Sequence, residues 1–349
     1  MMNLTLNQWQ YCYGKPDVTA LIRCQPQDFI VEEQLNFSPS GAGEHLLLQV
    51  EKIGQNTQFV ARELARLTGL RVRDISYAGL KDRHAITRQW FCFKWPIKQD
   101  LAWQEWQIEG VQILQCLRHS RKLRLGALKR NLFQIRLRQV SDVPALLTRV
   151  QLVAKGVPNY YGEQRFGRDG GNLQLAEQLF SGGSIADRQI RGLALSASRS
   201  WLFNTIVSAR LQAGTFMQIL PGDVLQLDGS GSVFAVEQPD ATLNGRLLDA
   251  DLHLTAPLVG SGKALSTALA AELEQQAILP WQHWQHGLIE LRVQAARRSM
   301  RLIPQQLTAE QQGNEVSLQF ALPAGCFATS VLRELALYQD SSRHLALME

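Results

Sequence analysis

The sequence lacks the features that identify several large classes of protein. Its five cysteines are scattered, odd in number and contain no Cys-x-x-Cys pair, which argues against a disulfide framework and against a cysteine-rich metal site. No segment approaches the roughly 20 apolar residues of a membrane span, and the first residues lack the charged and apolar regions of a signal peptide. We therefore expect reduced cysteines, no membrane partner and a cytoplasmic location.

Acidic residues are missing from one long stretch, which runs from Arg118 to Arg138. An uncompensated basic run suits a phosphate backbone, although a solvated basic strand face has the same composition. A second cluster, Arg292, Arg297, Arg298 and Arg301, is expected on a helix. The basic residues of the first stretch are Arg118, Arg121, Lys122, Arg124, Lys129, Arg130, Arg136 and Arg138.

The 349 residues, 45% hydrophobic and 19% charged, suffice for a large core and predict two domains. Strands are expected at 28–33 and 45–50, which we expect to pair, and a helix between Asn56 and Gly69. Further strands are expected at 90–95, 131–138 and 316–322, further helices near 145–155, 198–211, 265–277 and 332–337, and a hairpin at 224–236.

One carboxylate stands among cations and turn residues in the segment 77–89, which joins the helix to the strand at 90–95. Its neighbours Lys81 and Arg83 favour the ionised form of Asp82, which suits a nucleophile better than a general acid. Judged from spacing alone, a Lys-Asp-Arg string most often forms a solvated turn.

Two other segments partly match known ligand-binding patterns, one for phosphate and one for a metal ion, but neither pattern is complete. Gly260-Ser261-Gly262-Lys263 is similar to a phosphate loop, but Pro257 and Ala264 break the Walker pattern. His283 and His286 are close enough for a metal, yet no third ligand is evident, so a surface helix is expected. The signatures of a zinc deaminase, His-x-Glu and Pro-Cys-x-x-Cys, do not occur.

The segment resembles the Gly-x-Lys-Asp-Lys/Arg-x-Ala-x-Thr-x-Gln motif of the tRNA pseudouridine synthase D (TruD) family, from Gly79 to Gln89. Other motifs of that family are matched in order: Asp28-Phe29 near the start, Asn131 with Phe133, 159–167, and the final Leu-Pro-Ala-Gly-x-Phe-Ala-Thr-Ser at 322–330. The resemblance extends over nearly the whole chain.

The resemblance implies an α+β fold with a pseudouridine synthase core, a mixed and mainly antiparallel sheet flanked by helices. Residues 1–156 and 304–349 would form this catalytic domain, and 157–303 an inserted α/β domain of the TruD type. The active site is expected in the cleft between the two.

The activity implied is isomerisation of uridine to pseudouridine in tRNA, most often at position 13 of the D arm, without metal or organic cofactor and without an obligate protein partner. Asp82 would be the nucleophile, attacking C1′, assisting loss of the 2′-proton, or adding to C6 of the base. A stacked uridine must be flipped into a pocket.

The residues implied for substrate binding are Phe29 and Phe327 as aromatic walls, Phe133 beneath, Asn131, Arg23 and Lys81. For a lone Phe, core packing is the common alternative. Contacts to the RNA backbone are expected from Arg121, Lys122, Arg124 and Lys129. The alternative function is that of a non-catalytic RNA-binding or RNA-folding protein.

Two positions depart from the family pattern. Arg23 stands where a Lys is expected to pair with the nucleophile, and its guanidinium can also grip a carboxylate. Arg130 stands where Gly more often precedes the Asn-x-Phe pair, which puts the placement of Asn131 in question.

Overall fold

A computed structural model provides the structure, which describes residues 5–6 and 8–342. The chain forms two compact units. The first unit contains the described residues up to Lys15, together with Gly156–Ile303 and Thr329–Glu334. The second unit contains Pro16–Lys155, Pro304–Ala328 and the described residues from Leu335 onward.

The second unit is built on an eight-stranded sheet in the order β14-β15-β7-β2-β5-β3-β6, with β4 paired to β5. The pair β2 and β5 is parallel, and every other pair in this sheet is antiparallel. The strands are β2 (Phe29–Leu35), β3 (His45–Ile53), β4 (Ser76–Tyr77), β5 (Ile86–Lys94), β6 (Val111–His119), β7 (Leu128–Leu137), β14 (Gln305–Gln312) and β15 (Glu315–Pro323).

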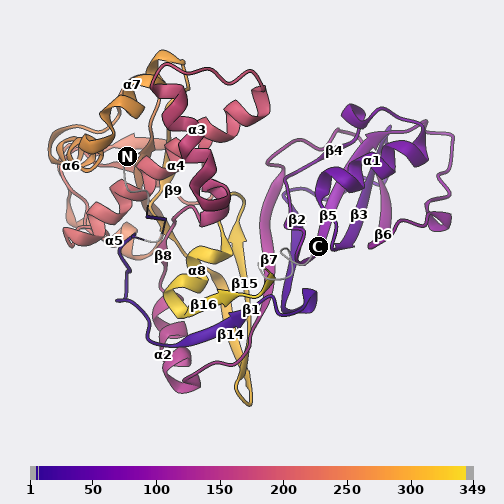
Figure 1. The fold of residues 1–349 in the computed structure, drawn as a ribbon, viewed down its shortest axis with the longest axis horizontal. Helices are drawn as coiled ribbons and strands as arrows, with labels where there is room; N and C mark the ends of the chain where they lie inside the picture. The colour runs from indigo at the N-terminus through magenta and orange to yellow at the C-terminus, as the bar shows by residue number, and fades with distance from the viewer. Residues whose placement is uncertain (1–4, 7, 343–349) are drawn as a thin grey trace. The chain divides into compact units, whose positions relative to one another are not determined.

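Helix α1 (Thr57–Thr68) covers one face of this sheet, against β3 and β5 (Figure 1). The Asn56 side chain accepts a hydrogen bond from the Phe59 amide at its start, and Gly69 ends it in the left-handed conformation, as the sequence predicts. Its buried residues Val60, Ala61 and Leu64 pack on Leu48 and other strand residues. Helix α2 (Val143–Val153) and a two-stranded parallel ribbon of β1 (Thr19–Ile22) and β16 (Leu337–Asp340) complete the unit.

The expected pairing of the strands at 28–33 and 45–50 is wrong, because β5 lies between β2 and β3 and pairs with both. The chain crosses from β3 through α1 before it returns as β5, so the parallel neighbour of β2 comes from farther along the sequence. A crossover of this kind leaves no signal in local alternation.

The first unit combines helices with two small antiparallel sheets, β10-β9-β11-β12 and β13-β8. Its core contains the buried rings of Trp201, Trp281 and Trp284. Its elements are β8 (Val157–Pro158), α3 (Gly171–Phe180), α4 (Arg188–Gln212), β9 (Val224–Leu227), β10 (Val233–Ala235), α5 (Ala241–Leu248), β11 (Leu252–Leu258), α6 (Ala268–Ile278), α7 (Gln282–Glu290), β12 (Ala296–Ser299) and β13 (Arg301–Leu302), with most of α8 (Ala328–Leu335).

The helix expected for the second arginine cluster is also wrong. Helix α7 ends at Glu290, Arg297 and Arg298 lie on β12, and Arg301 lies on β13. The alternation of β12 is only four residues long, too short to be distinguished from a helix by its pattern.

The expected fold class is confirmed: the protein is α+β, with a mixed, mainly antiparallel sheet flanked by helices. Among the described residues, no helix has the length and apolar character needed to cross a membrane. The assignment of a catalytic domain and an inserted domain stays a prediction.

Candidate active site

The loop that carries Asp82 is anchored to the sheet through Gln89 of its own motif and to the start of α1 through Thr57. The amide of Lys81 donates to Thr57 Oγ1 over 3.0 Å, and this hydroxyl donates to Gln89 Oε1 over 2.9 Å. The nitrogen of the Gln89 side-chain amide, Nε2, donates to the Gly79 carbonyl over 2.8 Å. Because Thr57 and Gln89 are buried, this chain of hydrogen bonds is shielded from water and holds the loop firmly.

A buried lysine on β3 supports the loop at Asp82 itself. Lys52 is 1% exposed, and its Nζ donates to the backbone carbonyls of Asp82, over 2.7 Å, and Gln55, over 2.8 Å. Burial lowers the pKa of Lys52 to about 8, since the charged ammonium loses hydration there, and nearby Asp82 opposes the shift. Sequence reasoning missed Lys52, although a lysine at an inward position of a buried strand is an available signal.

Arg23 contacts the carboxylate of Asp82. Its Nη2 lies 2.9 Å from Asp82 Oδ2, and its Nη1 lies 2.6 Å from Asp340 Oδ2 at the end of β16. The guanidinium also stacks 4.0 Å from the ring centroid of Phe29. Thus the expected contact between Arg23 and Asp82 is present, but the guanidinium divides its hydrogen bonds between two carboxylates, and Asp340 was not foreseen.

The backbone at Arg23 is strained, with a φ of +53° that few residues other than glycine adopt. Such conformations persist where surrounding contacts determine them, and they cluster at functional sites. Asp82, in contrast, keeps a third of its side chain exposed, 33%, so the carboxylate remains reachable from solvent. The site therefore holds a fixed cation against an accessible anion.

Lys81 is paired with an acid that the sequence did not single out. Its Nζ lies 2.5 Å from Glu33 Oε1, and the Glu33 side chain is fully buried. The other Glu33 oxygen accepts the Trp90 amide over 2.9 Å. Lys81 thus links the loop that carries Asp82 to β2, while the Arg83 Nε donates to the Gly54 carbonyl.

Three of the predicted uracil-binding residues, Phe29, Asn131 and Phe133, lie on one face of the sheet. Asn131 lies opposite Glu33, and Phe133 lies opposite Val31, in the register of β7 with β2. Asn131 is 8% exposed, and its Oδ1 has no hydrogen-bond partner among the described residues. A buried amide oxygen without a partner is costly, so it marks a place where a ligand donor could bind.

The aromatic residues are placed unequally. Phe29 and Phe133 are buried and meet edge to face with centroids 6.3 Å apart, and Phe133 stacks on Phe320. Both rings are packed within the unit, and little of either is exposed. Phe327 is half-buried in the turn that follows β15, after Gly325 with a φ of +81°.

Arg130 is accommodated without a glycine conformation. It lies within β7, opposite Gln34 of β2 and Pro323 of β15, and its Nε donates to Gln34 Oε1 over 2.5 Å. A side chain that projects from the pleat in this way leaves the following Asn131 in regular strand register.

The basic stretch divides into two kinds of residue. Arg121, Lys122, Arg124 and Lys129 are exposed, and none forms an ion pair with a residue in the described part of the chain. Arg138, by contrast, is held by Asp28 and Glu315 at 2.8 and 2.5 Å. The four expected backbone contacts are therefore the members of the stretch that remain available to a phosphate.

Within the described residues no group of three or more His, Cys, Asp and Glu side chains could hold a metal ion. His283 of α7 pairs instead with Glu177, 2.9 Å away. The polar groups around Asp82 are hydrogen-bonded side chains without a set of metal ligands.

Comparison with known proteins identifies the family. The model of the family described as tRNA pseudouridine synthase D (TruD) matches residues 5–183 and 183–335. A relative from Aeromonas hydrophila named tRNA pseudouridine synthase D is 45% identical over 337 residues, covering 96% of each chain. One of the same name from Shewanella oneidensis is 46% identical and covers 96% of this chain and 90% of its own.

A crystal structure from Methanosarcina mazei that carries the TruD name superposes with a TM-score of 0.73 at 20% identity, covering 93% of this chain and 95% of the other. At that identity the superposition supports the fold, and the sequence matches establish the relationship. This chain belongs to the tRNA pseudouridine synthase D (TruD) family.

Proposed function

We propose that this protein isomerises uridine to pseudouridine in tRNA, at position 13 of the D arm, with Asp82 as the nucleophile. One observation carries the proposal within the family: an accessible carboxylate is held by Arg23 in a loop that buried side chains anchor at Gly79, Lys81 and Asp82. Anchoring of this kind preorganises a reacting group and so lowers the cost of reaching the transition state.

The reaction breaks the N1–C1′ bond, turns the uracil and forms a C5–C1′ bond, after which the C5 proton moves to solvent and N1 gains one. Atoms and electrons balance without an oxidant or hydrolysis. In one route Asp82 attacks C1′ and the uracil leaves as an anion; in a second, the carboxylate takes the 2′-proton; in a third, it adds to C6. Each route uses the carboxylate as an anion, and the Arg23 guanidinium lies 2.9 Å from it.

The flipped base would lie beside Phe29 and Phe133 and stack on Phe327. Asn131 Oδ1 would accept a hydrogen bond from uracil N3–H, which would satisfy the buried oxygen. Arg23 and Lys81 would hold the loop and the nucleophile, and Arg121, Lys122, Arg124 and Lys129 would contact the phosphates of the tRNA.

The decisive experiment incubates the purified protein with an unmodified tRNA transcript and maps pseudouridine by position. We expect pseudouridine at position 13 with the natural chain and none with Asp82→Asn, because the amide has a similar shape but no anionic charge. Asp100→Asn, which alters an exposed carboxylate, serves as the matched control and should keep full activity.

Turnover by Asp82→Asn at the rate of the natural chain contradicts the assignment of Asp82 as the nucleophile. If the natural chain binds tRNA tightly but forms no pseudouridine, the RNA-folding alternative is favoured. For the pocket, Phe327→Ala should reduce kcat/KM by roughly ten- to a hundred-fold, since stacking of a base is worth about 1–3 kcal/mol. Phe327→Tyr should retain most of the activity. If Phe327→Ala is as active as the natural chain, Phe327 is not part of the pocket.

A further inference from the structure

A hollow of about 710 Å³ lies in the second unit between α1, the turn at Val72–Asp74 and the basic loop after β6. Apolar side chains form its floor and four cations stand around it. The floor residues are Ala61, Ile75, Tyr77 and Leu123, and the cations are Arg62, Arg73, Lys122 and Arg124.

The four cations are not neutralised by the protein. No Asp or Glu lines the hollow, all four side chains belong to exposed residues, and none forms an ion pair within the described part of the chain. Their neighbours behave differently: Arg66 pairs with Glu63, and Arg71 pairs with Asp74. The hollow is therefore a concentrated positive site.

Apolar surface is exposed at the same place. Val72 is 50% exposed and Leu125 is 77% exposed, and both line the hollow. Exposed aliphatic groups beside uncompensated cations suit a ligand that has both a flat apolar part and a strong negative charge.

Residues that line the hollow come just before the Asp82 loop in the sequence. Tyr77, on β4, lies five positions before Asp82, and its ring packs against Phe91 of β5. On the other side of the hollow, the amide of Gly126 donates to the carbonyl of Ala78 over 2.9 Å. The same short segment that presents Asp82 thus also forms one wall.

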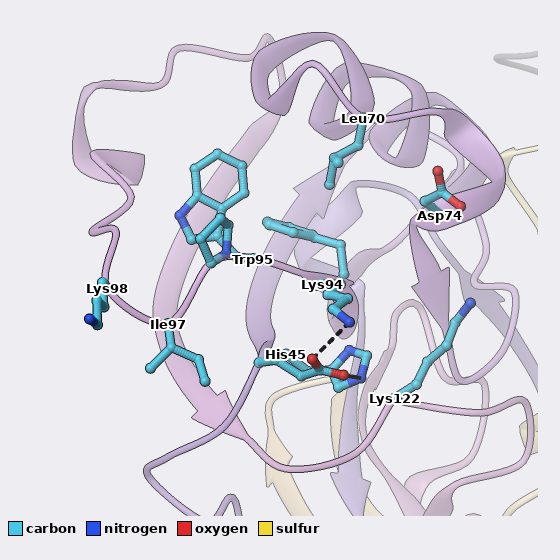
Figure 2. Close-up of a pocket in the computed structure, with 11 residues that line it drawn as sticks. His45, Leu70, Asp74, Lys94, Trp95, Ile97, Lys98 and Lys122 are labelled. Carbon is cyan, nitrogen blue, oxygen red and sulfur yellow. Dashed lines mark ion pairs between the residues drawn. The ribbon is translucent and has the colours of Figure 1, made fainter.

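A neighbouring hollow of about 870 Å³ shares Lys122 but has a different character (Figure 2). Its floor includes Trp95 and Leu70, and its lining contains the carboxylates Glu44 and Asp74. The ammonium of Lys94, which is labelled in Figure 2, lies 2.7 Å from the Glu44 carboxylate. Because two carboxylates stand in its lining and one of them pairs with Lys94, this hollow is the weaker candidate for an anion.

We propose that the hollow between α1 and the basic loop binds an unpaired nucleotide of the tRNA substrate, outside the pocket for the target uridine. The base covers the apolar floor, and the flanking phosphates contact Arg62, Arg73, Lys122 and Arg124. Arg62 and Arg73 come from a helix and a turn that carry none of the family motifs given above. The inference rests on the proposed function, since it takes tRNA as the substrate.

The test compares two double variants that remove the same charge. Arg62→Ala/Arg73→Ala alters the hollow, and Arg66→Ala/Arg71→Ala alters the adjacent, paired arginines of the same two elements. We measure the Kd of an unmodified tRNA transcript over a series of salt concentrations. Arg62→Ala/Arg73→Ala should raise Kd at least about tenfold. It should also lower the slope of log Kd against log salt concentration by the amount expected for the loss of nearly two phosphate contacts. The control should change Kd by less than about twofold.

A second pair of variants tests the base. Val72→Ser/Leu125→Ser should raise the Kd of tRNA several-fold with an unchanged salt dependence, while Ile97→Ser, which alters an exposed residue outside this hollow, should not. The effect should vanish with a fully paired RNA duplex of equal length. An equal loss with the duplex means that only phosphates are bound and overturns the proposal.

The outcomes separate the two hypotheses. If the natural chain forms pseudouridine while Arg62→Ala/Arg73→Ala binds tRNA like its control, the inference fails alone. If the variants differ as expected but the natural chain modifies no tRNA, the proposed reaction fails and the binding site stands. If the hollow variant loses affinity only for vesicles containing phosphatidylserine, the site serves an anionic lipid surface and the inference is overturned.

Discussion

Two arginine-rich segments that look alike in the sequence have opposite roles in the structure. In the first unit, Arg297 is 6% exposed, lies 2.8 Å from Glu274 and donates to Thr255. Arg298 donates to Asn159 and lies 4.4 Å from the ring centroid of Tyr161. Burial lowers the pKa of Arg301, whose guanidinium lies beside Gly156. These three arginines use their charges inside the unit, whereas Arg292 of the same cluster is exposed.

In the second unit, the loop after β6 presents Arg121, Lys122 and Arg124 to solvent without a carboxylate. A count of basic residues in a sequence therefore does not measure the electrostatic field available to RNA. A cation contributes to that field when the fold places no acid or carbonyl against it.

The largest effect is expected from breaking the internal pair. Arg297→Met leaves Glu274 buried without its partner and should lower the free energy of unfolding by about 3–5 kcal/mol. Arg297→Met/Glu274→Met, in which no lone charge remains, should recover most of the loss. Denaturant unfolding of both variants checks this, and an unchanged midpoint for Arg297→Met would falsify the structural role of the pair.

Reversing the exposed charges should act on RNA instead. Arg121→Glu/Lys122→Glu is expected to weaken tRNA binding roughly ten- to a hundred-fold and to flatten the plot of log Kd against log salt concentration. The free energy of unfolding should stay within about 0.5 kcal/mol, because neither side chain is buried. An unchanged salt slope would return this loop to an ordinary solvated surface.

Arg118 tests the contrast inside a single segment. Its guanidinium donates to the carbonyls of Trp95, Pro96 and Gln99, at 3.0, 3.0 and 2.8 Å. Arg118→Gln should lower the free energy of unfolding by about 1–2 kcal/mol, because several charge-assisted hydrogen bonds are lost. Arg121→Gln is the matched control. Equal stability of the two variants would contradict a structural role for Arg118 that Arg121 lacks.

Lys52 tests a third case, a buried cation whose hydrogen bonds go to carbonyls. Its pKa of about 8 in the folded protein lies below the ordinary 10.5, so between these pH values the unfolded chain binds more protons. Stability should therefore rise with pH from about 8 to 10.5, on top of the response of other groups. Below that window the amine is charged in both states and the full cost of burial is present.

Lys52→Met removes the titrating group, so the difference in unfolding free energy between Lys52→Met and the natural chain should change across this pH range and be constant below it. Because Lys52 also holds the Asp82 carbonyl, the variant should lower kcat, and Lys52→Arg should restore part of it. A pH-independent difference shows that the amine does not titrate there.

Several elements could be predicted from local patterns, because their signals lie within a few residues. Asn56 and Gly69 bound α1 through capping chemistry, and the alternation of Phe133, Ile135 and Leu137 places their side chains in the core along β7. The motif around Asp82 likewise follows from contiguous residues. What failed, such as the pairing of β2 with β3, depends on segments distant in the sequence.

The site shows the same division. Sequence alone pointed to Asp82 and to a contact with Arg23, but it gave no indication that Glu33 would bind Lys81 or that Asp340 would share Arg23. These partners come from β2 and β16, which approach the loop only in the folded sheet and ribbon. Whether a carboxylate pairs with a given cation depends on the distance between them and on their burial. Neither can be read from a short segment of sequence.

By itself the sequence determined the family, the mixed and mainly antiparallel fold class, the identity of Asp82 as the candidate nucleophile and the basic character of the loop after β6, because each rests on contiguous residues or on their order. Only the tertiary structure decided which cations are neutralised, which acid each one faces, and that Arg62 and Arg73 meet Lys122 around one hollow. Electrostatic interactions fall with distance through space, and the distance between side chains is a property of the folded chain.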